Sequence, residues 1–101
     1  MMVMKAARRA YHETKTSINA CVEKAKVSPY VAPKLLEDLN DNLKESTKKD
    51  AVLAKQEVAE KNGKVWNEGD CKAIRTLIQE MKELNDAAKS LIKKVETITK
   101  A

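Results

Sequence analysis

The chain has 101 residues, the length of one small domain, and a formal net charge of +5. It holds two glycines and two prolines, whereas a β-sandwich or barrel needs a turn roughly every 8–12 residues. That shortage of turn formers argues against a β-sandwich or barrel. No apolar run approaches the roughly 20 residues of a membrane-spanning helix. We therefore expect one all-α domain covering residues 1–101.

The positive charge comes mainly from lysine, because Arg8, Arg9 and Arg75 are the only arginines. Bidentate recognition of guanine or phosphate relies on the planar guanidinium of arginine. A lysine-rich surface of mixed sign is typical of a solvated protein, so we do not favour specific nucleic-acid binding. The basic residues near the start of the chain also leave binding to a membrane surface open as an alternative.

Residues 3–27 are predicted to form the first helix. Apolar positions recur there with alternating spacings of three and four, which places them on one stripe of a helix. The helix should stop at Ser28, because a residue that precedes proline is disfavoured in the α region. The stripe consists of Met4, Ala7, Tyr11, Thr14, Ile18, Cys21 and Ala25.

Residues 33–61 are predicted to form the second helix, with Pro33 as its first residue. Its apolar stripe is interrupted by seven polar residues at 44–50. We favour a continuous helix, since no Gly or Pro interrupts it. A break near Ser46 and Thr47, where a capping box could start a new helix, is the alternative. The expected stripe is Leu36, Leu39 and Leu43, then Ala51, Ala54 and Val58.

Residues 70–99 carry the clearest helical pattern. Asp70 is the expected N-cap after the loop 62–69. The apolar seam has the 3-4 spacing of a coiled coil, and Ile78 and Ile92 widen it. The seam runs through Ile74, Leu77, Met81, Leu84, Ala88, Leu91, Val95 and Ile98.

Three helices of similar length joined by roughly 6–8 residues predict an up-down-up three-helix bundle. A four-helix bundle follows instead if the middle helix breaks. In the three-helix topology Cys21 and Cys71 would lie about 25 Å apart at roughly 1.5 Å per residue. A disulfide needs Cα atoms roughly 5.5 Å apart, so we expect two free thiols and favour a cytoplasmic setting. A disulfide would instead indicate four helices and a secreted or periplasmic setting.

No catalytic or metal-binding pattern is present in the sequence. His12 is the only histidine, and the two glycines, Gly63 and Gly69, cannot form a phosphate-binding loop. Cys21 and Cys71 are too far apart in sequence to form a zinc motif. We therefore expect neither an enzyme nor a bound cofactor.

A haem-binding electron-transfer bundle is an alternative from another functional class. The segments 9–12 (Arg-Ala-Tyr-His) and 81–86 (Met-Lys-Glu-Leu-Asn-Asp) resemble the haem-ligating segments of the four-helix-bundle b-type cytochromes. That resemblance implies His12 and Met81 as axial ligands, a pairing known for haem iron. The two segments occur here in the reverse order along the chain, so we do not assign the chain to that family.

The two connections carry the most informative large side chains. Val65 and Trp66 either cover one end of the bundle or form an exposed anchor for a partner, and Tyr30 with Val31 poses the same choice at the other end. Exclusion leaves a non-enzymatic interaction or structural module that binds another protein, with self-association through the third helix possible. The candidate binding residues are Tyr30, Val65, Trp66, Ile78 and Ile92.

Overall fold

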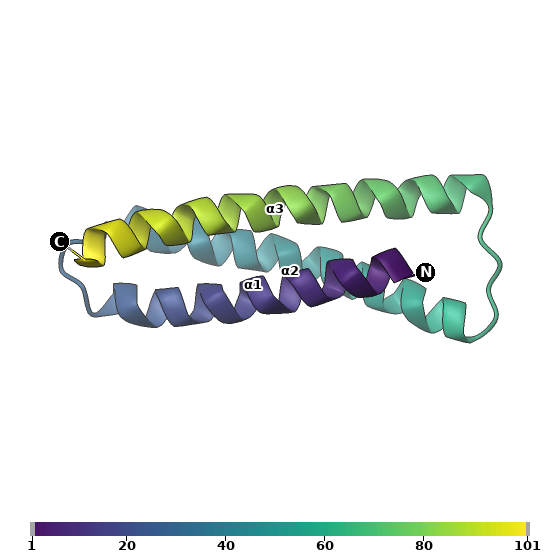
Figure 1. Cartoon of the computed structure of the whole chain (residues 1–101), viewed down its shortest axis with the longest axis horizontal. Coiled ribbons are helices and arrows are strands. Elements are labelled where there is room, and N and C mark those ends of the chain that lie inside the picture. The colour runs from purple at the N-terminus through teal and green to yellow at the C-terminus, as the bar shows by residue number, and fades with distance from the viewer. Residues whose placement is uncertain (1, 101) are drawn as a thin grey trace.

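The computed structural model describes residues 2–100, which form three helices and, within that range, no strand. They are α1 (Met2–Lys26), α2 (Pro33–Lys61) and α3 (Glu68–Lys100). The helices run up, down and up, so α1 and α3 are parallel (Figure 1), and each helix packs on both others. The bundle measures 52 × 19 × 17 Å. The predicted all-α three-helix bundle is confirmed, and the four-helix alternative is wrong because α2 is continuous.

The loop between α2 and α3 is held by a capping motif at each side. After α2, Gly63 takes a φ of +88°, and the N–H of Lys64 bonds to the Ala59 carbonyl at 3.0 Å. This Schellman-type ending uses glycine because the left-handed conformation is costly for other residues. Asn62 and Gly63 therefore form the C-terminal cap of α2.

The N-terminus of α3 differs from the prediction by two residues. Asn67, not Asp70, precedes the helix, and its Oδ1 accepts a hydrogen bond from the Asp70 backbone N–H at 2.8 Å. Asp70 in return accepts one from the Asn67 N–H at 3.3 Å, which completes a capping box. Asp70 as N-cap is therefore wrong. Asn and Asp both favour the N-cap position, so the sequence alone does not distinguish whether Asn67 or Asp70 takes it.

The cores of α1 and α3 follow their predicted stripes. All seven stripe residues of α1 and all eight seam residues of α3 are buried or half-buried. Apart from Thr14 and Leu84, these residues belong to two apolar clusters that also include residues of α2. One surrounds Ile18 and Leu39, and the other surrounds Tyr11, Leu53 and Met81. The unbroken 3-4 spacing was sufficient to place these faces.

The buried face of α2 was predicted correctly only in its first half. Leu39 is buried, but Ala51 and Val58 are exposed. The interior positions between the two apolar clusters are polar instead: Asn42, Ser46 and Asp50 are buried on α2, as are Thr14 on α1 and Asn85 on α3. We call this set the polar layer. Its α2 members lie in or beside the polar stretch 44–50 that interrupts the predicted apolar stripe.

Hydrogen bonds satisfy only part of the polar layer and its surroundings. Asn42 Nδ2 donates to the Leu84 carbonyl at 2.9 Å. The hydroxyl of Tyr11 lies 2.7 Å from that of Thr47, across α1 and α2. Within residues 2–100, three buried side-chain oxygens have no hydrogen-bond partner, which costs free energy in a core. They are Asn42 Oδ1, Ser46 Oγ and Asn85 Oδ1.

Cys21 and Cys71 are both free, as the three-helix topology requires. Cys21 lies near the end of α1 and Cys71 at the start of α3, so the parallel arrangement separates them along the bundle. Cys21 is buried, and that burial raises the pKa of its thiol, whereas Cys71 is half-buried.

We expect iodoacetamide to alkylate Cys71 before Cys21 in the native protein, because the thiolate is the reactive form. Intact mass after timed alkylation checks this, and denaturation should then expose both thiols. The Cys71→Ser variant serves as the control, since it should leave only the slow site. A mass two hydrogens lower with no reactive thiol would mean an intramolecular disulfide, and that would contradict the topology.

Candidate functional site

Each connection supplies one covering residue and one exposed residue. Val31 is buried in one apolar cluster, and Trp66 is half-buried against the other. Tyr30 is 77% exposed and Val65 is 89% exposed. Trp66 and Val31 thus each cover one end of the bundle. Val65 and Tyr30 do not cover an end, so that interpretation is wrong for these two residues.

Trp66 is fixed by contacts on several sides. Its ring packs on the cluster that contains Leu53, and its Nε1 donates to Glu60 Oε2 at 3.1 Å. The Lys64 ammonium lies 4.7 Å from the ring centroid, within the range of a cation–π contact. The two capping motifs hold the backbone on either side. The indole is therefore held in a defined position by residues of this chain.

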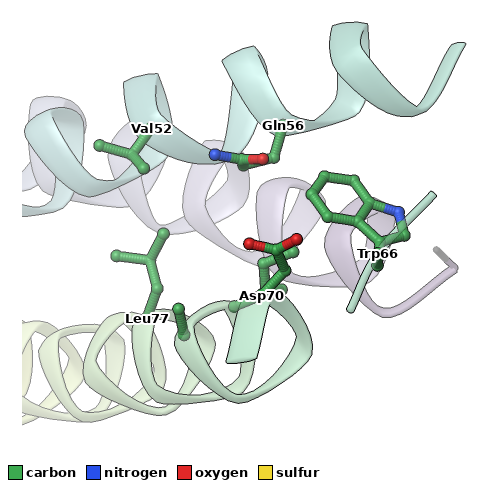
Figure 2. Close-up of a pocket in the computed structure, with 7 residues that line it drawn as sticks. Val52, Gln56, Trp66, Asp70 and Leu77 are labelled. Carbon is green, nitrogen blue, oxygen red and sulfur yellow. The ribbon is translucent and has the colours of Figure 1, made fainter. Parts of the chain in front are cut away.

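Beside Trp66 a small hollow opens between α2 and α3, which we call the Trp66 hollow. Figure 2 shows Val52 and Gln56 on α2 facing Asp70 and Leu77 on α3, with the Trp66 ring at one end. Its volume is about 90 Å³. That is well below the roughly 300–1,000 Å³ of pockets for small molecules, but it suits one aliphatic side chain. The lining residues are Val52, Gln56, Trp66, Asp70, Ala73, Ile74 and Leu77.

The lining of the Trp66 hollow is mainly apolar. Five of its seven lining residues are apolar or aromatic, and Gln56 and Asp70 supply its polar groups. The Asp70 carboxylate is already engaged with the Asn67 N–H. None of the lining residues is a serine, cysteine, histidine or lysine, so the hollow holds no nucleophile paired with a base. It can take up an apolar group and orient it with two polar contacts.

The five predicted binding residues do not form one surface. Ile78 packs on the apolar cluster near Trp66, whereas Ile92 packs on the cluster at the other end. Tyr30 belongs to the connection at that other end. Sequence reasoning missed Val52, which is 46% exposed beside Trp66. The sequence feature that could have indicated Val52 is that this valine lies outside the predicted apolar stripe of its helix.

The two residues considered as haem ligands lie in different surroundings. His12 is exposed, with its ring centroid 5.0 Å from that of Tyr11. Met81 is almost completely buried in the core. The structure therefore does not direct the two side chains to one site. Among residues 2–100, no three side chains of the His, Cys, Asp and Glu types gather as a metal site would require.

Comparisons with known proteins add no assignment. No family model matches the chain, and no match was found among the curated proteins or the solved structures. Of the helices in the described part of the chain, none is both long and apolar enough to cross a membrane.

Proposed function

We propose that this chain is a non-enzymatic helical module that binds another protein, and that the Trp66 hollow takes an apolar side chain of that partner. The observation that supports this most is a preformed hollow of about 90 Å³ walled by the only tryptophan. Tryptophan is enriched among the residues that dominate binding energy at interfaces. A concave apolar site that suits one side chain fits a protein ligand better than a cofactor.

The energetics favour an anchor of this kind. Burying one aliphatic side chain contributes about 1.5–3 kcal/mol. The walls come from two packed helices and from an indole already held by Glu60 and Lys64. Little ordering entropy is therefore lost on binding, and more of the contact energy appears as affinity.

The Val52→Lys variant tests this proposal. Val52 lines the hollow and is partly exposed, so a lysine there should leave the fold intact and place a charge where the partner's apolar group enters. We expect partner affinity to fall about tenfold or more. Partners would be captured from a cell extract on the immobilised chain, and each would then be purified and titrated directly.

The matched control is Val58→Lys, on the same helix and similarly exposed, but outside the Trp66 hollow. It should keep full affinity, and circular dichroism should show equal helicity in both variants. Equal loss in the two variants, or equal retention, would contradict the proposed site.

A further inference from the structure

We propose that the whole groove between α2 and α3 receives one amphipathic helix of the partner, with its acidic residues over Lys93 and Lys94 and a basic residue over Glu80 and Glu83. This inference rests on the proposed function, because the Trp66 hollow is one end of that groove. It specifies the kind of partner and the direction of its charges.

The first observation is a row of half-buried aliphatic residues on α3. The seam of α3 divides into two rows with a repeat of seven. Ile74, Met81, Ala88 and Val95 are buried. The second row, every member of which is only half-buried, is Leu77, Leu84, Leu91 and Ile98. A repeat of seven is the pattern along which a neighbouring helix places its own side chains.

The second observation is a line of hollows along the same groove. Leu77 lines the Trp66 hollow. Leu84 lines a second hollow of about 300 Å³, with Glu45, Lys49, Glu80 and Glu83. Ile98 lines a third of about 490 Å³, with Leu35, Ser90, Lys93, Lys94 and Thr97.

Three members of the half-buried row thus line three successive hollows between the same two helices. From Leu77 to Ile98 the row covers three heptads, or about 32 Å at roughly 1.5 Å per residue. A partner helix of about 20 residues would span that length. Its apolar side chains would enter the groove every third or fourth residue, as in other complexes of a helix with a groove.

The groove between α1 and α2 is less suited to an apolar helix face. Arg8 crosses it to reach Asp50 and Glu57, at 2.9 and 3.4 Å. The hollow there is lined largely by charged side chains, including Lys5 and Lys61. In the α2–α3 groove one ion pair, between Lys49 and Glu80 at 3.2 Å, crosses the middle. The side chain of Glu80 stays 48% exposed and can accept a second cation.

Charge then sets the direction of the partner helix. The third hollow carries two lysines and no acid, whereas the second carries three glutamates and one lysine. Complementary charges steer encounter and fix register at interfaces. A partner helix that is acidic at one end and basic in its middle therefore matches the groove in one orientation.

A second copy of this chain is a poorer occupant. In the part of the chain that the structure describes, the exposed large hydrophobic residues are Val3, Val27, Tyr30, Val52, Val58 and Val65. None of these lies on α3, and α2 carries only Val52 and Val58. A helix therefore has no outward heptad stripe to offer to the groove of another copy.

Two synthetic helical peptides test the inference on the full-length chain. Both carry leucines at positions that match the half-buried row. The matched peptide has glutamates over Lys93 and Lys94 and lysines over Glu80 and Glu83, and the reversed peptide exchanges those charges. Trp66 is the single tryptophan and walls the first hollow, so its fluorescence reports binding, with titration calorimetry as the second measurement.

We expect the matched peptide to bind about tenfold more tightly than the reversed one. In the chain carrying both Lys93→Glu and Lys94→Glu that preference should be lost, because each peptide then has one attractive and one repulsive charge contact. Val52→Lys should weaken both peptides. Binding of neither peptide, or a preference that the double variant leaves unchanged, would overturn the inference.

The experiments distinguish an error in the extended-groove inference from an error in the proposed function. A captured partner that is lost with Val52→Lys but unaffected by the Lys93→Glu and Lys94→Glu pair would leave the Trp66 hollow as the site and overturn the extended groove. Sedimentation of the chain alone tests whether a second copy of the chain occupies the groove. A dimer that the matched peptide fails to displace, and that Val52→Lys dissociates, would assign the groove to a second copy.

Discussion

Replacing Leu53 by alanine should lower the free energy of unfolding by about 2–5 kcal/mol, the range for deleting a buried leucine side chain. Leu53 is 0% exposed and lies in the apolar cluster with Tyr11 and Met81. A bundle of this width has few alternative contacts with which to refill the cavity. Urea unfolding, monitored by circular dichroism, measures the change. The dependence of the unfolding free energy on urea concentration should stay constant if only stability changes.

The control for Leu53→Ala is Val58→Ala on the same helix. Val58 is 58% exposed, so its truncation should change stability by no more than about 0.5 kcal/mol. The two variants together determine which face of α2 lies inside the bundle. If Val58→Ala were costly and Leu53→Ala harmless, α2 would bury the face that carries Val58 instead of the face that carries Leu53.

The fold of α1 and α3 could be predicted because their apolar spacing is unbroken. The second half of α2 could not, since its buried apolar residue is Leu53, which lies outside the predicted stripe. Ala51 and Val58 continued a regular spacing, while Ser46 and Asp50 looked like solvated residues. Which face is buried was decided by partners on the other helices, and helical periodicity holds no information about those partners.

The candidate site, too, could be predicted from the sequence only in part. That Trp66 covers a bundle end followed from a large side chain in a short connection. The Trp66 hollow itself could not be predicted, because it depends on Val52 lying toward α3. That orientation follows from the position of Leu53, which the sequence stripe misplaced. One error in the buried face of α2 therefore concealed the main binding candidate.

The ion pair of Arg8 with Asp50 is the clearest reason why α2 buries a polar face, and it gives the second large prediction. The guanidinium donates to both carboxylate oxygens of Asp50, at 2.9 and 3.3 Å, and to Glu57 at 3.4 Å. The hydrogen bond to Asp50 raises the pKa of Arg8 above its already high ordinary value. Arg8→Ala would leave the buried carboxylate of Asp50 without its cation.

We expect Arg8→Ala to lower the free energy of unfolding by about 2–3 kcal/mol, less than the roughly 3–5 kcal/mol found when a fully buried pair is broken, because Arg8 is partly exposed. Arg9→Ala, at the exposed neighbouring position, is the matched control and should change little. Since a buried ion pair is weak evidence for net stability, the Arg8→Met and Asp50→Leu double variant should recover most of the loss. Urea unfolding of the unmodified chain and of these three variants measures the changes. Equal effects of Arg8→Ala and Arg9→Ala would mean that the ion pair of Arg8 with Asp50 does not hold α2 against α1.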